Sequence, residues 1–432
     1  MTSTSAPIDD ADVIVVGAGP GGSTAGYYLA RAGLNALVLE KASFPRDKIC
    51  GDGLTPRAVS ELVSMGVDIT GDGWMKNRGL RVHGGGHTIE VPWPTMASYP
   101  DFGLVRPRKD FDALLANHAR QAGARVQERT NVTGPILHER TGRVVGVRAR
   151  LLDENGRRTG EEVEYRAPLV IAADGVSARM ALALGIEKRD NRPMGVAVRT
   201  YFKTPLHDDE WMESHLELWD GERGNSNLLP GYGWVFPAGD GTANVGLGSV
   251  SSTATATKLD YRDLFKRWIA HTPEEWGFTE ENQVGPVRGA ALPMAFNRKP
   301  LYRKGMMLIG DAGGMVSPFN GEGIAYAMKA ARTAAEIAAQ SLVRPDAYQR
   351  EKTLRRYPEI MAQELGGYFN LGRVFVRIIE HPEAMRFLTR YGLPRPTLMK
   401  LTMKLLADSY ESHGGDSFDR LIAGLARIAP KS

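Results

Sequence analysis

The sequence predicts an α/β fold: a Rossmann-type nucleotide-binding domain with an inserted antiparallel-sheet domain and a C-terminal helical region. Three observations predict this architecture. A short β-branched run, residues 12–16, leads directly into a glycine-rich turn. Two further apolar runs, within 169–175 and 306–323, also end in Gly and Asp residues. Between them, residues 228–250 alternate large and small side chains with the period of a β-strand.

Composition limits the classes of protein that the chain can belong to. A length of 432 residues exceeds the usual size of one core, so several domains are expected. The hydrophobic fraction of 42% and the charged fraction of 24% are typical of globular proteins. A net charge of +4 without a dense Lys/Arg block predicts no nucleic-acid partner. The single cysteine, Cys50, cannot form an internal disulfide, which favours a cytoplasmic location.

The first glycine-rich turn has the spacing of a nucleotide-binding loop. Gly17 permits the tight turn, Gly19 lets the backbone approach a pyrophosphate, and Gly22 lets the following helix pack against its strand. The next apolar run, residues 36–39, ends in Glu40. A carboxylate at this point, about 20 residues beyond the glycines, can accept hydrogen bonds from a ribose diol.

Two later segments indicate which nucleotide is bound. Asp174 and Gly175 follow the apolar run 169–172, and Asp311 follows another apolar run. An Ala-rich helix is predicted to begin near Gly321, so its free backbone N–H groups face whatever lies there. A flavin carries negative charge at its N1–C2=O edge when reduced, and it suits this position. We therefore predict FAD.

The order GxGxxG, Glu, Arg (in RPRKDFD), DG and then GD with GEG resembles the FAD-dependent oxidoreductases built like p-hydroxybenzoate hydroxylase. Their DG motif usually reads DGxxSxxR, whereas DGVSAR is shorter, which leaves Ser177 and Arg179 without an assigned role. Together, the motifs and the resemblance give the expected cofactor-binding residues as Gly17, Gly19, Pro20, Gly22, Glu40, Lys41, Cys50, Gly51, Arg108, Asp174, Gly175, Asp311, Gly321, Gly323 and Ile324.

The segment between the DG and GD motifs predicts a hairpin with an aromatic face. Tyr232, Trp234 and Phe236 alternate with small residues, so one side of a strand carries all three rings. A turn, GDGT, and a return strand with Gly246 and Gly248 follow. Rings beside glycines predict a flat apolar slot for a substrate, although an aromatic core face would give the same pattern. The expected substrate-lining residues are Tyr232, Trp234, Phe236, Pro237, Gly246 and Gly248.

The runs PGYGWVFP with GLG, and FPRDKICGDGLTPRAV, resemble the geranylgeranyl reductase family of flavoenzymes. This resemblance implies the FAD-dependent reduction of an isoprenoid carbon–carbon double bond in a prenyl lipid. The runs SHLELWDG, LLPGYGWVFP and EEWGF are similar to actinobacterial members that saturate one isoprene unit of the menaquinone side chain. Geranylgeranyl groups of diphosphates or of archaeal-type lipids are the alternative substrates.

The expected reaction gives the aromatic residues and the cysteine a role. An isolated alkene must gain a proton together with a hydride, so positive charge develops on carbon, and aromatic faces stabilise cations. The resemblance implies that Cys50 lies near the flavin and matters to reduction. The expected catalytic residues are Cys50, Tyr232, Trp234 and Phe236. Cys50 can also be a small packing residue, since free cysteine often behaves as a hydrophobe.

Two other functions share the fold or the cofactor. A flavin monooxygenase or halogenase is one, but YGWVFP replaces the WxWxIP motif of halogenases. A non-catalytic flavin protein that binds lipid is the other. No second GxGxxG occurs, so the external electron donor, NAD(P)H or a ferredoxin-type protein, stays open.

The remaining predictions concern organisation and partners. Nine scattered histidines show no metal-ligand spacing, so no metal is predicted. Residues 1–10 lack a signal-peptide pattern, and SSTATATK, residues 251–258, predicts a surface loop. Basic amphipathic helices in 346–432 can close a substrate tunnel or reversibly contact the inner face of the cell membrane. The predicted segments are 1–75, 106–190 and 286–345 for the FAD-binding domain, 76–105 and 191–285 for the substrate domain, and 346–432 for the helical region.

Overall fold

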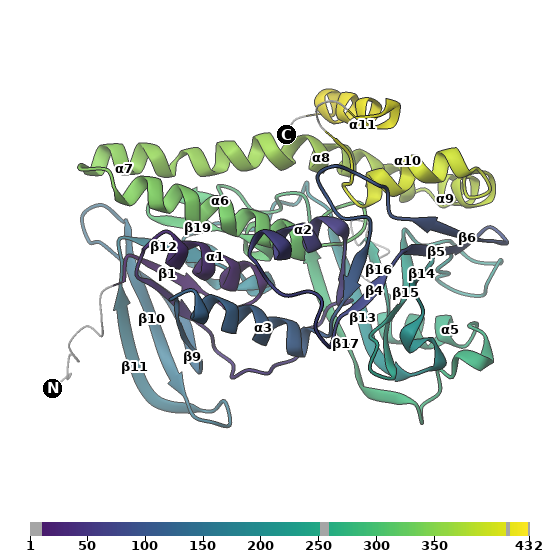
Figure 1. Ribbon diagram of the computed structural model, residues 1–432, viewed down its shortest axis with the longest axis horizontal. Coiled ribbons are helices and arrows are strands. Elements are labelled where there is room, and N and C mark those ends of the chain that lie inside the picture. The colour runs from purple at the N-terminus through teal and green to yellow at the C-terminus, as the bar shows by residue number, and fades with distance from the viewer. Residues whose placement is uncertain (1–10, 251–258, 412–414, 431–432) are drawn as a thin grey trace.

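A computed structural model of the chain describes residues 11–250, 259–411 and 415–430. It confirms the predicted α/β class, with a parallel nucleotide-binding sheet, a large second sheet and a helical C-terminal region (Figure 1). The loop predicted at 251–258 lies outside the described residues.

The first sheet has six strands and carries the nucleotide-binding motifs at its edge. Its three central strands are buried at every position, so both faces are covered, as the apolar runs predict. All pairs are parallel except the edge pair β18–β19. The spatial order is β18 (Tyr302–Arg303), β19 (Met306–Leu308), β12 (Leu169–Ala172), β1 (Val13–Val16), β2 (Ala36–Leu39) and β8 (Arg125–Gln127).

The second sheet has seven strands and forms one wall of a large cavity. Its pairs are antiparallel, except that β14 and β5 run parallel. The predicted antiparallel sheet is confirmed for every pair except β5–β14, where a segment from an earlier part of the chain joins the sheet. Strand β17 continues eight residues past the boundary predicted at 285. The order is β17 (Gln283–Pro293), β13 (Met194–Lys203), β16 (Thr242–Val250), β15 (Gly231–Pro237), β14 (Trp211–His215), β5 (Gly79–Gly84) and β6 (His87–Pro92).

The remaining strands form two small sheets. The first packs below the nucleotide-binding sheet, and it has the order β11 (Arg158–Arg166), β10 (Val144–Leu152) and β9 (Thr130–Leu137) (Figure 1). The second joins the two large sheets, and it has the order β3 (Gly53–Leu54), β7 (Gly103–Val105) and β4 (Met75–Asn77).

Helices cover the first sheet and parts of both faces of the second, where α5 packs on one face and the C-terminal helices on the other. Helix α1 packs on α3 and α6 beside the parallel strands. The C-terminal helices α9 and α10 lie above β5 and β6 (Figure 1), where Leu393, Met399 and Met403 join a core cluster with Val82 and Met212. None of the described helices is both long and apolar enough to span a membrane. The helices are α1 (Pro20–Arg31), α2 (Pro56–Ser64), α3 (Arg108–Gln121), α4 (Arg179–Ala183), α5 (Tyr261–Ile269), α6 (Ile324–Leu342), α7 (Ala347–Leu354), α8 (Arg356–Ile379), α9 (Pro382–Phe387), a π-helix (Leu388–Gly392), α10 (Pro396–Leu406) and α11 (Ser417–Ile428).

Candidate functional site

A cavity of about 730 Å³ lies between the two large sheets and continues under the C-terminal helices. It begins at the glycine-rich turn, passes beneath strand β15 and ends in an apolar arm. Most of the predicted site residues line it, although they come from distant parts of the chain. The predicted residues outside its lining are Gly22, Pro237 and Gly246.

The glycine-rich turn shows why glycine is needed at two of its positions. Gly17 has φ +97°, a backbone conformation that other residues rarely adopt. A Cβ at Gly22 would lie 1.7 Å from the carbonyl oxygen of Gly17, so Gly22 shapes the turn without bordering the cavity. At Gly19 the nearest atom to a Cβ would be 3.9 Å away, which leaves open space beside the backbone. Pro20 then begins α1, whose N-terminus faces that space.

The acidic residue at the end of β2 is held by the turn itself. One oxygen of Glu40 accepts from the backbone N–H of Ala18 at 2.9 Å, and the other from Ala42 at 3.0 Å. Arg46 bonds Glu40 at 3.3 Å and also pairs with Asp112 at 2.8 Å. Lys41 is exposed at the rim of the cavity. Sequence analysis missed Arg46, because a lone arginine in a loop carries no periodic signal.

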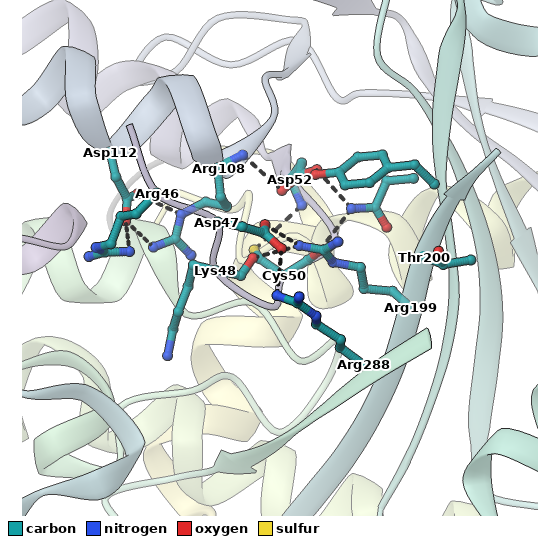
Figure 2. A network of polar contacts seen from close by, with 12 residues as sticks. Arg46, Asp47, Lys48, Cys50, Asp52, Arg108, Asp112, Arg199, Thr200 and Arg288 are labelled. Carbon is teal, nitrogen blue, oxygen red and sulfur yellow. Dashed lines mark hydrogen bonds and ion pairs between the residues drawn. The ribbon is translucent and has the colours of Figure 1, made fainter. Parts of the chain in front are cut away.

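Arg108 lies in the first turn of α3, and its guanidinium is fixed within that helix. It donates to both oxygens of Asp112, at 2.6 and 2.8 Å, in the two-pronged geometry that suits arginine and a carboxylate. The pair is buried, yet the side chain still lines the cavity. Arg46 shares Asp112 with it (Figure 2). Both guanidinium groups lie about 4 Å from the position of a Cβ at Gly19, so two cations flank the turn.

The DG and GD motifs bring two carboxylates to the same end of the cavity. Burial raises the pKa of both Asp174 and Asp311, while the charges of Lys48 and Arg108 oppose that rise at Asp311. Asp174 accepts from the N–H of Met180 at 3.0 Å, and its other oxygen is buried with no hydrogen-bond partner among the described residues. Gly175 also lines the cavity.

Helix α6 begins at the cavity, three residues later than predicted. Gly323 precedes its first residue, Ile324, and both line the cavity together with Gly321, which has φ +77°. No side chain in the described part of the chain caps this N-terminus, so its backbone N–H groups are available to an anion. Open space at Gly19, the uncapped helix and the nearby cations fit a diphosphate and the polar edge of a flavin.

The aromatic strand faces the cavity as a row of three rings. The centroids of Tyr232 and Trp234 are 5.9 Å apart, and those of Trp234 and Phe236 are 6.0 Å apart. Tyr232 donates its hydroxyl to the carbonyl of Asn320 at 2.6 Å, and the indole N–H of Trp234 donates to Asn244 Oδ1 at 3.0 Å. All three rings line the cavity.

Two of the predicted substrate-lining residues, Gly246 and Pro237, do not border the cavity. A Cβ at Gly246 would stand 2.3 Å from Cζ2 of Trp234, so the indole fills the space that sequence analysis assigned to a substrate. Pro237 is the last residue of β15 and is buried away from the cavity. Gly248 does line the cavity, and a Cβ there would meet no atom closer than 3.5 Å.

Cys50 lies in a loop, residues 47–53, which we call the cysteine loop. It borders the cavity, its sulfur accepts from the N–H of Asp52 at 3.4 Å, and burial raises the pKa of its thiol. A Cβ at Gly51 or at Gly53 would lie 3.3 or 3.2 Å from the ring of Phe236, so the loop lies directly against the aromatic strand.

Polar contacts anchor the cysteine loop to the second sheet (Figure 2). Arg199 on β13 bonds Asp47 at 2.6 Å and the carbonyl of Lys48 at 2.8 Å. Asp52 accepts from Tyr201 at 2.5 Å and from Asn244 at 2.7 Å. Sequence analysis missed these anchors, because only the register of β13 and β16 brings them to the loop.

The far arm of the cavity is apolar and is closed by the C-terminal helices. The sequence left open whether these helices close a substrate tunnel or contact a membrane. Residues from several of the helices line the cavity. Residues of β5, β14 and the following segment form the opposite wall. The apolar residues of the arm are Leu80, Trp93, Met212, Leu216, Phe375, Ile379, Met385, Leu388, Leu393, Leu398, Met399, Met403 and Leu406.

The histidines are less scattered than their sequence positions suggest. The parallel pairing of β5 and β14 brings His83 beside His215, and the carboxylate of Glu213 lies within 4.8 Å of a ring nitrogen of each. Met212 and Ser214 line the cavity, so the alternation of β14 points Glu213 and His215 to the other face of the sheet. Glu213 is bonded by Arg81 at 2.5 Å and by His83. The two imidazole rings stack 4.3 Å apart at 11°, so their lone pairs do not converge on one point.

Comparison with known proteins identifies the family and its cofactor. Residues 10–344 match the family described as the FAD binding domain. The chain belongs to this FAD-binding family. Its cofactor is FAD, as the glycine-rich turn and the DG and GD motifs predict.

Relatives of this FAD-binding protein are reductases. It is 36% identical to the menaquinone reductase of Mycobacterium tuberculosis over 424 residues, which is 98% of this chain and 97% of the relative. It is 33% identical to the digeranylgeranylglycerophospholipid reductase of Methanocella arvoryzae over 364 residues, which is 82% of this chain and 83% of the relative. The chain is therefore an oxidoreductase of the group that includes these enzymes.

Solved structures confirm the fold. A geranylgeranyl bacteriochlorophyll reductase-like protein from Thermoplasma acidophilum has a TM-score of 0.70 at 23% identity, covering 92% of this chain and 99% of its own. A flavin-dependent brominase also has a TM-score of 0.70, at 21% identity, covering 97% and 100%. These identities support the shared fold alone.

Proposed function

We propose that this enzyme uses FAD to reduce a carbon–carbon double bond of a prenyl lipid, specifically one isoprene unit of the menaquinone side chain. The observation that carries the proposal is the continuity of one cavity. It joins the nucleotide loop, the aromatic row and a long apolar arm within about 730 Å³. A polyprenyl tail in the arm would bring one of its double bonds beneath the aromatic row.

Binding in the apolar arm would be driven by the burial of hydrocarbon. Each CH₂ group that leaves water contributes about 0.8 kcal/mol. Four methionines, Met212, Met385, Met399 and Met403, line the arm, and their flexible side chains can adapt to an irregular chain. The arm contains few hydrogen-bonding groups, so it would select length and shape instead of polar substituents.

Bound FAD, when reduced, supplies the hydride for the double bond. The aromatic row then has two tasks. Its rings exclude water, and their π-faces stabilise the positive charge that develops on carbon, by about 0.5–2 kcal/mol for each contact. Trp234 is held by its bond to Asn244 and Tyr232 by its bond to Asn320, so two of the three rings are fixed before substrate binds.

Cys50 is the proposed source of the proton. Cys50 borders the cavity, the next residue, Gly51, packs against Phe236 and Trp234, and burial raises the pKa of the thiol, so it carries a proton at neutral pH. The proton would pass from sulfur to one alkene carbon while the other carbon gains the hydride. The thiolate that remains would face Arg108, whose positive charge stabilises it.

The relatives favour menaquinone over the lipids of archaea. Similarity to menaquinone reductases extends over 98% of the chain, whereas similarity to the archaeal relative extends over 82%. The experiment is to purify the enzyme from its host without added substrate, extract bound lipid and determine it by mass spectrometry. A menaquinone supports the proposal; a diphosphate or a glycerophospholipid with geranylgeranyl chains favours the alternative substrates.

The mouth of the apolar arm supports contact with a membrane surface. Leu388 and Leu398 line the arm and are also exposed, so hydrocarbon is continuous from the cavity to solvent. Phe387 and Tyr391 beside them are 62% and 47% exposed. Exposed Arg386, Arg390 and Arg395 surround these residues. Apolar side chains ringed by cations match an anionic lipid surface.

Vesicle sedimentation tests this contact. We expect the enzyme to bind vesicles that contain phosphatidylglycerol, to release them at high salt, and to bind poorly after Phe387→Ser with Tyr391→Ser. Tyr348→Ser on α7 is the control, because Tyr348 is 77% exposed but lies outside the lining of the cavity. Equal binding by the double variant and the control would contradict the membrane proposal.

A further inference from the structure

Asn244 connects the aromatic row to the cysteine loop. It lies on β16, opposite Phe236 on one neighbouring strand and Tyr201 on the other, and no part of it is exposed. Its Oδ1 accepts from the indole N–H of Trp234 at 3.0 Å. Its Nδ2 donates to the carbonyl of Cys50 at 2.8 Å and to Asp52 Oδ2 at 2.7 Å. One amide therefore satisfies all three partners with good geometry.

Asp52 extends this connection into the first domain. It has φ +65° and is buried, so its backbone conformation is held by the contacts around it. Its Oδ2 accepts from Tyr201 as well as Asn244, and its Oδ1 accepts from the N–H of Arg108 at 3.2 Å. The loop is thus fixed on one side to the sheet above the cavity and on the other to the start of α3.

The two ends of the Asn244 side-chain amide form hydrogen bonds with different parts of the site. The carbonyl side holds an aromatic ring, and the amino side holds the backbone that carries the thiol. Gly51 and Gly53 allow the loop to lie flat on Phe236, but a flat contact does not prevent sliding. The directional bonds to Cys50 and Asp52 do, because a hydrogen bond weakens steeply when its donor and acceptor move apart or out of line.

We infer that Asn244 is a positioning residue that fixes the Cys50 thiol relative to the indole of Trp234. The role of Asn244 in turnover rests on the proposed function, whereas its positioning of Cys50 relative to Trp234 does not. Asn244 lies outside the cavity lining, so we assign it no direct contact with substrate or cofactor. It acts through Cys50 and Trp234. Aspartate at this position would retain the acceptor for Trp234 but place an oxygen against two acceptors of the loop.

The chain offers a direct reporter, because Cys50 is its only cysteine. The experiment measures the rate of Cys50 alkylation by iodoacetamide in the FAD-loaded enzyme. We expect Asn244→Asp and Asn244→Ser to raise the rate at least tenfold, because the loop is released from the sheet. Thr200→Val is the matched control: Thr200 is buried on β13, and its hydroxyl donates to the carbonyls of Val284 and Gly285 and to no other described residue. The control should alkylate at the wild-type rate.

The same variants separate this inference from the proposed function. If prenyl reduction is the activity, we expect kcat to fall at least tenfold while KM changes little, because the apolar arm is intact. If no reduction occurs in the wild type, the alkylation rates still test the connection. An alkylation rate within twofold of wild type in folded Asn244→Asp and Asn244→Ser would overturn the inference. So would a failure of both variants to fold while Thr200→Val folds, since Asn244 would then support the whole domain.

Discussion

The indole ring of Trp234 occupies the space that a side chain at Gly246 would need. A Cβ on Gly246 would lie 2.3 Å from Cζ2 of the ring and 2.6 Å from the carbonyl oxygen of Val198. The ring therefore packs directly against strand β16. It can lie in this position only because residue 246 has no side chain. This contact sets the height of the aromatic row above the cavity.

Gly246→Ala should displace the indole. We expect a loss of stability of about 1–3 kcal/mol, as for other overpacked cores, and a change in tryptophan fluorescence. Gly248→Ala is the matched control on the same face of β16, because its Cβ would meet only ordinary contacts of 3.5 Å. Thermal unfolding of the two variants checks the prediction, and equal melting temperatures would contradict it.

In the glycine-rich turn, alanine at position 19 and alanine at position 22 should have different effects. Gly19→Ala should leave the apoprotein as stable as wild type, because 3.9 Å of space surrounds its Cβ, but it should weaken FAD binding at least tenfold by blocking the backbone approach. Gly22→Ala should prevent the turn from forming, because its Cβ would lie 1.7 Å from a carbonyl oxygen. Flavin titration and apoprotein melting measure both effects. Unchanged FAD affinity in Gly19→Ala would show that the diphosphate lies elsewhere.

Cys50→Ala should retain FAD, because the cysteine loop is held mainly by Asp47, Asp52 and the carbonyl of Cys50. We expect turnover to fall at least a hundredfold if the thiol donates the proton. Cys50→Ser is the informative companion, since a hydroxyl retains the size and can donate a proton less readily. Flavin absorbance and product formation check the prediction; unchanged turnover in Cys50→Ala removes the thiol from the reaction.

Asp52 predicts a pH-dependent stability. Burial raises its pKa to about 6 from 3.8, while the hydrogen bonds from Tyr201 and Asn244 oppose the rise. Between these two values the folded state binds more protons than the unfolded state, so this carboxyl's contribution to the free energy of unfolding falls as pH rises. Asp52→Asn removes the titration and tolerates the same positive φ. The unfolding free energy of wild type minus that of Asp52→Asn should decrease from about pH 4 to 6 and stay level above pH 6. If this difference increases with pH, the prediction is contradicted.

The nucleotide site could be predicted from sequence because its signals are local. Gly17, Gly19 and Gly22 lie within one turn, and Asp174 and Asp311 each follow a buried strand. Such short patterns specify a loop together with its ligand. The direction of the aromatic row was equally local, since a strand with period two puts alternate residues on one face.

The rest of the site depends on contacts between distant residues. Asn244 is 192 positions from Asp52, and Tyr201 is 149 positions from it. Strand register decides that they meet, and alternation of side chains does not reveal register between strands. The misassignment of Gly246 has a related cause, because alternation gives its face but not the direction in which Trp234 points. The helices of the apolar arm were predicted, but an amphipathic pattern does not say what a helix covers.

The measurement that tests the central claim most directly is a single-turnover reaction in the absence of oxygen. The purified, FAD-loaded enzyme is reduced chemically, mixed with menaquinone, and the lipid is determined by mass spectrometry while flavin absorbance is recorded. We predict that the lipid gains two hydrogen atoms in its side chain as the flavin is reoxidised. A lipid that is unchanged after flavin reoxidation, or one that gains an oxygen atom when air is admitted, would contradict the account.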